Sequence, residues 1–103
     1  MDYQSAIAAL ADPSRQAIVE RLRRGPLAVG RIAEGLPISR PAVSQHLRVL
    51  SDAGLLSVRA DGNRRLYALS PDGVAALRQY LDALWDDAFT AFGKAASDRA
   101  RKG

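Results

Sequence analysis

The segment 39–69 limits the possible fold more than any other part of the chain. Ser39 is a residue type that caps helices, and the proline at position 41 fits the first turn of the helix that follows. This helix is predicted to end at Ala53, because Gly54 readily takes the left-handed conformation that stops a helix. The segment therefore begins with a helix whose two ends are both specified locally.

A hairpin is predicted immediately after this helix. Two strand-like runs, 55–59 and 64–69, lie on either side of Asp61-Gly62, which is among the stronger short signals for a tight turn between strands. A capped helix followed directly by a hairpin is the pattern of a winged helix.

Three shorter helices are expected before this segment. The first covers about residues 3–11. Asp12-Pro13 combines a capping acid with proline at the first helical position and starts the second helix, which ends at Gly25-Pro26. The third covers about residues 29–35, and a tight turn joins it to the capped helix.

A final long helix is predicted from Pro71 to about Phe92. Ser70-Pro71 repeats the cap-and-proline signal, and apolar residues then recur at alternating steps of three and four, as in a packing seam. The expected fold class is mainly α with a small β-hairpin: a winged helix-turn-helix of five helices and a two-stranded wing. Residues 1–93 are expected to form this single domain, followed by a polar, mobile tail at 94–103.

Positive charge is concentrated in the middle of the chain. The net charge is +4, but ten arginines oppose four acidic residues between positions 15 and 65. From position 71 to the end, five acidic and five basic residues balance. Clustered positive charge favours phosphate backbones, although it can also serve only to keep a surface soluble.

One face of the capped helix has the composition expected of a surface that reads DNA. At about 100° per residue, its apolar residues share one side. The opposite side carries no bulky apolar residue and consists of Pro41, Ser44, Gln45, Arg48 and Asp52. Gln45 can pair with adenine, and Arg48 with guanine or a phosphate. The alternative is the solvent face of an ordinary amphipathic helix.

Phosphate contacts are expected on both sides of this reading face. Ser39, Arg40 and Ser44 lie near the helix N-terminus, where side chains and backbone N–H groups meet phosphate. The hairpin adds polar and basic side chains that suit the minor groove or flanking phosphates, namely Arg59, Asn63, Arg64 and Arg65. Charge on an exposed edge strand can also serve only to prevent edge-to-edge association.

The seam of the last helix is too wide and aromatic for a chain of 103 residues to cover alone. Packing against the same helix of a second copy, together with the first helix, would bury it and would place two reading helices about one DNA turn apart. The residues expected at this homodimer interface are Ile7, Leu10, Leu77, Leu81, Leu84, Trp85, Phe89 and Phe92. The alternatives are a groove for another partner or a ligand pocket beneath the aromatic side chains.

No cofactor, metal site or catalytic site is predicted. The chain has no cysteine, which excludes disulfides, thiolate metal sites and cysteine catalysis. The single histidine, His46, lies beside the core face and is expected to be a hydrogen-bonded structural residue, since one histidine cannot form a transition-metal site unaided. A triad of Ser44, His46 and Asp52 is excluded because Ser44 and His46 project from different faces.

Three motifs resemble the ArsR family, the arsenic- and metal-responsive winged-helix repressors of bacteria. Residues 39–56, SRPAVSQHLRVLSDAGLL, resemble the family's recognition segment. Residues 9–15, ALADPSR, resemble its "ALADPTR" opening, and residues 62–69, GNRRLYAL, resemble its wing. Together they span about residues 5–72 in the family's order.

This resemblance implies a homodimeric repressor whose first and last helices form the interface. It also implies operator contacts from the wing arginines and from Ser44, Gln45, His46 and Arg48. For His46 this differs from its place on the helical wheel.

The chain departs from the metal-sensing members of the family. Those members carry a cysteine pair on the helix before the turn, or histidine and acidic ligands on the last helix. The matching stretch here is Ala28-Val29-Gly30, and the last helix has Asp82, Asp86 and Asp87 but no histidine. The chain therefore resembles a metal-independent branch, for which no small-molecule effector is identified.

The predicted function is a sequence-specific double-stranded DNA-binding regulator: a homodimeric repressor that blocks its operator. The alternative is a winged-helix protein-interaction module without specific DNA binding, whose outer surface would be acidic or apolar rather than rich in arginine. Enzyme activity is not predicted, because no pair of titratable groups converges. The chain lacks a signal-peptide pattern and any apolar run of roughly 20 residues, so a cytoplasmic location without a membrane partner is expected.

Overall fold

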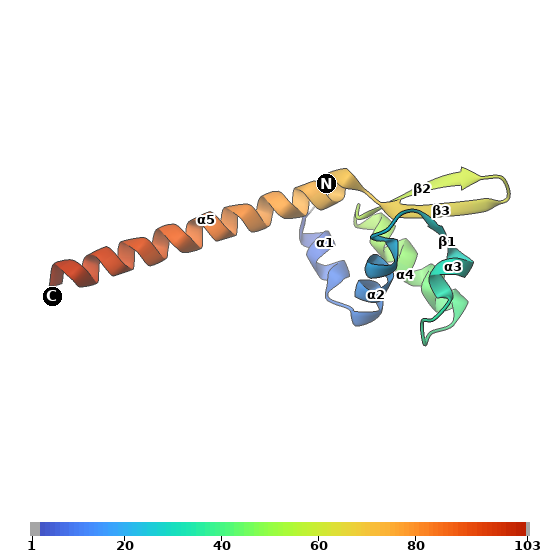
Figure 1. Ribbon diagram of the computed structural model, residues 1–103, viewed down its shortest axis with the longest axis horizontal. Coiled ribbons are helices and arrows are strands. Elements are labelled where there is room, and N and C mark those ends of the chain that lie inside the picture. Colours follow the sequence, from blue (N-terminus) through green and yellow to red (C-terminus); the bar gives the residue numbers. More distant parts are fainter. Residues whose placement is uncertain (1–2, 103) are drawn as a thin grey trace.

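The computed structural model describes residues 3–102, apart from the side chains at 97, 98 and 100–102. The elements in chain order are α1 (Tyr3–Leu10), α2 (Pro13–Leu22), β1 (Leu27–Ala28), α3 (Val29–Ala33), α4 (Arg40–Asp52), β2 (Leu56–Asp61), β3 (Arg64–Leu69) and α5 (Pro71–Lys102). Five helices and a hairpin confirm the predicted winged helix-turn-helix (Figure 1).

The predicted helix caps are present. The Asp12 carboxylate accepts hydrogen bonds from the backbone N–H groups of Ser14 at 2.7 Å and Arg15 at 3.2 Å. The backbone N–H of Arg15, in particular, holds the pKa of this carboxyl below its usual value, because hydrogen bonds to the charged form favour it. The Ser39 hydroxyl accepts from the N–H of Ala42 at 3.2 Å, and α4 then ends before Gly54, whose φ is 81°.

The core lies where α4 meets the other helices. Ile18 of α2, Ile32 of α3 and Leu47 of α4 are fully buried, and the aliphatic side chains around them complete one cluster. The buried members that α4 contributes are Val43, Leu47 and Leu50, as the wheel predicts. This inner face fixes α4 against the rest of residues 3–69, which we call the body. The opposite face of α4 is therefore presented at a defined orientation.

The sheet has three strands rather than the two predicted. Its order is β1-β3-β2, and both pairings are antiparallel. In β1, Leu27 pairs with Tyr67 at the base of the wing. The prediction missed β1 because two residues are too few to show the alternation by which a strand is recognised.

Helix α5 leaves the body and projects away from the wing (Figure 1). It contacts α1, where the rings of Tyr3 and Tyr80 stack with centroids 4.3 Å apart. Beyond Tyr80 every described side chain of α5 is exposed. The radius of gyration is consequently 18.7 Å, compared with about 13 Å for a compact chain of this length.

The end of α5 was predicted too early. The helix continues past Phe92 to Lys102, through the stretch predicted to be a polar tail. Lys94, Ala95 and Ala96 favour helix, and no proline follows that would end it. The apolar seam ends at Phe92, but residues that favour helix continue beyond it.

The junction between body and α5 is a close contact between two glycines. The N–H of Ser70 donates to the carbonyl of Leu55 at 2.8 Å, which brings the start of α5 to the end of α4. Gly73 is buried there, and a Cβ at this position would overlap the carbonyl oxygen of Gly54. Only a residue without a side chain allows this approach.

Candidate nucleic-acid interface

The outer face of α4 is free, as the sequence predicts. Pro41, Ser44, Gln45 and Arg48 are all exposed, and Asp52 continues this face at the C-terminal end of the helix. A helix with one face locked into the core and a polar face directed outward suits insertion into the major groove. Gln45 and Arg48 are the side chains on this face that can make two hydrogen bonds to one base.

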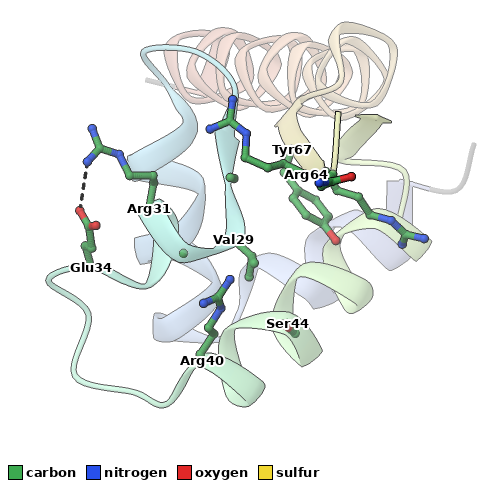
Figure 2. Close-up of a pocket in the computed structure, with 11 residues that line it drawn as sticks. Val29, Arg31, Glu34, Arg40, Ser44, Arg64 and Tyr67 are labelled. Atoms are coloured by element: carbon green, nitrogen blue, oxygen red, sulfur yellow. Dashed lines mark ion pairs between the residues drawn. The ribbon is translucent and has the colours of Figure 1, made fainter. Parts of the chain in front are cut away.

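Two residues at the start of α4 have structural tasks besides any contact with DNA. The Ser39 hydroxyl oxygen accepts from the N–H of Ala42, which leaves its own proton free to be donated. Arg40 lies against α3, because a Cβ placed at Gly30 would be 3.5 Å from its Nη2. Figure 2 shows Arg40 rising from the start of α4 toward Val29.

Strand register divides the wing residues between its two faces. Val58 pairs with Tyr67, and Ala60 pairs with Arg65, so these four side chains share the face toward α4. Arg59 pairs with Leu66 and projects from the opposite face.

The predicted wing arginines are therefore not equivalent. Arg65 is directed to the reading helix, whereas Arg59 points away from it. Arg64 is turned back on the hairpin, since its Nη2 lies 2.7 Å from Asp61 Oδ2. Asp61, which was predicted only as a turn residue, therefore partly neutralises the charge of Arg64.

Two open hollows lie between α4 and the wing. The larger, about 670 Å³, extends from the start of α3 to the hairpin tip, and the smaller, about 410 Å³, lies beside the middle of α4. Ser44, Arg65 and Tyr67 line both hollows, which makes them parts of one groove. Figure 2 shows Tyr67 directed from β3 toward α4 within this space.

The groove is strongly basic. Its side chains include five guanidinium groups and one carboxylate, contributed by Arg31, Arg40, Arg48, Arg64, Arg65 and Glu34. Glu34 Oε2 lies 3.6 Å from Arg31 Nη1, which is the ion pair drawn in Figure 2. An open basic groove beside a polar helix face suits a phosphate backbone.

Arg31 and Tyr67 are groove residues with polar side chains that were not predicted as site residues. Arg31 lies on α3, and nothing in the sequence singled it out from the other arginines before the turn. Tyr67 lies half-buried in the wall of the groove. Residues two positions apart on a strand share a face, so the spacing of Arg65 and Tyr67 could have predicted that Tyr67 lies beside Arg65 in the groove.

His46 lies away from the reading face. It is half-buried, and its Nδ1 is 3.5 Å from Nη1 of Arg15 on α2. This position agrees with the helical wheel and differs from the operator contact that the family resemblance implied.

A second exposed surface runs along α5. Six large apolar side chains of this helix are exposed: Val74, Leu81, Leu84, Trp85, Phe89 and Phe92. We call them the apolar stripe. Val74 and Phe92 lie five full turns apart on one line of the helix, and the rings of Trp85 and Phe89 are in contact, with centroids 4.9 Å apart.

The predicted interface residues divide between this stripe and the body. Ile7 of α1 is exposed, as is Tyr3, which was not predicted. Leu10 packs against the buried core, and Leu77 is half-buried. Leu10 is therefore less available to a second copy than the exposed side chains of α5.

Residues 10–59 match the family model described as a helix-turn-helix domain. The chain is 58% identical over 86 residues to the HTH-type transcriptional regulator Rv2034 of Mycobacterium tuberculosis, covering 84% of this chain and 80% of that protein. An ArsR-like transcriptional regulator from Rhodococcus sp. RHA1 superposes with a TM-score of 0.75 at 29% identity, over 91% of this chain and 92% of the other. The chain belongs to the ArsR family. It is thus a winged helix-turn-helix transcriptional regulator by descent as well as by fold.

A further solved structure bears on the assembly of ArsR-family proteins. The homodimeric winged helix-turn-helix DNA-binding domain of Mb0332 from Mycobacterium bovis has a TM-score of 0.66 and 28% identity, and covers 82% of this chain and 78% of that one. It is described as a homodimer, whereas the apolar stripe of this ArsR-family chain is uncovered in the single protomer.

The described part of this ArsR-family chain also lacks two features. Within residues 3–102, no helix is both long and apolar enough to cross a membrane. Among the described side chains, no three histidine or acidic groups gather in a way that could hold a metal ion.

Proposed function

We propose that this ArsR-family regulator is a homodimeric repressor that occupies an operator, with α4 in the major groove and the wing along the adjacent backbone. The observation that carries the proposal is the groove shared by Ser44, Arg65 and Tyr67. It joins a face suited to bases and a face suited to phosphates into one surface, which a partner-recruiting module without DNA affinity would not need.

Within this surface we assign sequence reading to Gln45 and Arg48, which are exposed on α4. Arg40 and Arg65 border the groove and take phosphates, which position the protein without reading sequence. Ser39 and Asn63 lie beside them at the helix start and the hairpin tip, where they can donate further hydrogen bonds to the backbone.

The apolar stripe supplies the dimer contact in this proposal. Trp85, Phe89 and Phe92 are more than half exposed, and no described element of the same chain covers them. A second copy covers them by pairing the two stripes about a two-fold axis, with Tyr3 and Ile7 at the margin. Such a contact joins identical patches and presents two reading helices to the two halves of a palindromic operator.

The direct test is operator binding by fluorescence polarisation. The duplex is taken from the region upstream of the gene, chosen for an inverted repeat that the protein protects from nuclease. Gln45→Ala or Arg48→Ala should weaken binding to this duplex by roughly 1–3 kcal/mol and binding to a random duplex by less. Arg78→Ala, which removes an exposed arginine from α5, is the matched control and should leave both affinities unchanged.

A second pair of variants tests the wing. Arg65→Ala should weaken binding to all duplexes and lower the slope of affinity against salt by about one, because a phosphate contact is lost. Arg59→Ala removes the same charge from the far face of the same hairpin and should have a smaller effect. Equal losses for the two variants would contradict the assignment of the groove, and operator affinity unchanged by Gln45→Ala and Arg48→Ala would contradict the role of α4.

A further inference from the structure

One side chain connects three helices on the side of α4 that faces away from the wing. Arg15 of α2 is largely buried, with 19% of its side chain exposed. Its Nε donates a hydrogen bond of 2.6 Å to the carbonyl oxygen of Ala9 in the last turn of α1. Its Nη1 lies 3.5 Å from His46 Nδ1 on α4. A single guanidinium therefore joins α1, α2 and α4.

The Arg15–His46 contact requires a neutral histidine. A guanidinium has only donors, so His46 Nδ1 must be the acceptor and must carry no proton. When the imidazole is protonated, both ring nitrogens become donors, and two cations then face each other at the same distance. The contact thus changes from attraction to repulsion on one proton transfer, to the only histidine in the chain.

The other charged groups near His46 are already oriented toward Arg15 or the backbone. Asp12 Oδ1 accepts from the N–H groups of Ser14 and Arg15, and its Oδ2 lies 3.9 Å from Arg15 Nη1. The Asp12 carboxylate also attracts His46 electrostatically, in addition to these contacts. Asp52 of α4 lines the shallow hollow between α1 and α4 together with Arg15. Helix α1 contributes no charged side chain. Arg15 is therefore the charged group that the imidazole ring contacts directly.

The location of this contact links the two functional surfaces. His46 follows Gln45 and precedes Arg48 by two positions, so it shares a turn of α4 with the residues proposed to read bases. Through Ala9, the same arginine holds α1, whose Tyr3 stacks on Tyr80 of α5. We propose that the Arg15–His46 contact is a pH-sensitive brace that positions α4 for operator binding, so that protonation of His46 weakens that binding. The proposal rests on the operator function argued above.

The sign of the pH dependence separates this role from a direct contact. If His46 touched the DNA backbone, its protonation would add a cation beside phosphates and would tighten binding as the pH falls. A brace has the opposite effect, since protonation disrupts the contact. Arg15 and His46 are in this account positioning residues, which act through Gln45 and Arg48.

The test measures operator affinity from pH 8 to pH 5.5 at constant ionic strength, by fluorescence polarisation. In parallel, the single histidine C2–H resonance reports the protonation of His46 by NMR. The expected result is an affinity that falls about tenfold along the same curve as the resonance, which is within the usual range of coupling between two sites. H46N keeps an acceptor oxygen near the position of Nδ1 but does not titrate, and R15Q removes the guanidinium. Both variants should show an affinity that does not vary with pH, whereas R78Q should retain the wild-type dependence.

Several outcomes would overturn the brace. Affinity that rises as the pH falls would show that His46 contacts DNA directly. A constant affinity with a melting temperature that follows the His46 titration would show a role in stability alone. Failure to prefer the operator at pH 8 would contradict the proposed function instead. In that case, the amide resonances of α4 decide: a change between pH 8 and pH 5.5 that R15Q abolishes supports the brace, and α4 resonances that stay the same refute it.

Discussion

The body, residues 3–69, and the long helix α5 differ in how far their apolar side chains are buried within the chain. In the body, Ile18, Ile32 and Leu47 are completely buried by the same chain. In α5, apolar residues recur just as regularly, yet Trp85 is 66% and Phe92 74% exposed. Similar helical periodicity therefore corresponds to a buried core in the body and to an exposed apolar surface in α5.

This difference shows which part of the molecule depends on a second copy. The body has its own core and presents the groove without help. The apolar stripe has no cover within the described chain and so gains its free energy only on association. Substitutions in the two regions should therefore differ in whether their effects depend on protein concentration.

The largest effect is expected for Leu47→Ala. It removes a fully buried side chain from the centre of the core and should lower the free energy of unfolding by about 2–5 kcal/mol at every protein concentration. Urea denaturation at two concentrations measures this. Leu81→Ala deletes the same atoms from the exposed stripe and serves as the comparison. An equal loss for both variants at low concentration would remove the distinction between the two regions.

Gly73→Ala tests the junction between the regions. The new Cβ would overlap the Gly54 carbonyl, and the required backbone shift should cost about 1–3 kcal/mol. Gly93→Ala is a matched control in the same helix, because nothing lies within 4 Å of its Cβ position. That control should be neutral or stabilising by up to about 1 kcal/mol, from helix propensity alone. The comparison of the two melting temperatures would fail if both variants changed alike.

A smaller effect is expected for Phe89→Ala, and it should appear in association alone. Loss of this exposed ring should raise the dimer dissociation constant by about tenfold, or about 1.4 kcal/mol, while the body stays folded. Sedimentation equilibrium measures the constant, and the emission of Trp85, the only tryptophan, gives a second reading. Thr90→Ala, which is next in sequence but off the stripe, should leave it unchanged. A wild-type protein that remains monomeric at high concentration would refute the role of the stripe.

The smallest effect concerns Asp12 and tests the body alone. Its pKa is lowered in the folded state, chiefly by the hydrogen bond from the N–H of Arg15, so its contribution to stability is full above its unfolded pKa, about 3.9, and is lost as the pH falls through the lower folded value. Asp12→Asn preserves the cap but not the charge, and should flatten the dependence of melting temperature on pH below about pH 4. Asp12→Ala, which loses both, should melt earlier at all pH values. An unchanged slope in Asp12→Asn would assign the acid sensitivity to other groups.

The parts of the fold predicted from sequence are those in which local chemistry and burial agree. Asp12 and Ser39 cap the helices they were expected to cap, and the core face of α4 is the one its period predicts. Strand β1 was missed because its two residues join the sheet only through pairing with Tyr67 and Leu66, far along the chain. No local pattern reports such a pairing.

The site residues show the same division. The exposed face of α4 follows from its own period, and its residues are exposed as expected. The different directions of Arg59, Arg64 and Arg65 depend on strand register and on the ion pair with Asp61, which composition does not reveal. His46 was placed beside the core by its angle, but its Arg15 neighbour comes from another helix.

Because α5 joins the body at the contact between Gly54 and Gly73, a small rotation there produces a large displacement at the other end of the helix. The helix has 32 residues and is about 48 Å long, so a rotation of about 5° at this contact moves its far end by about 4 Å. In the proposed dimer the second copy fixes α5 in place. The same rotation would then move the body, and with it α4 and the wing, relative to α5. In that dimer, the rigidity of the Gly54–Gly73 contact would limit the range of half-site spacings that the protein tolerates.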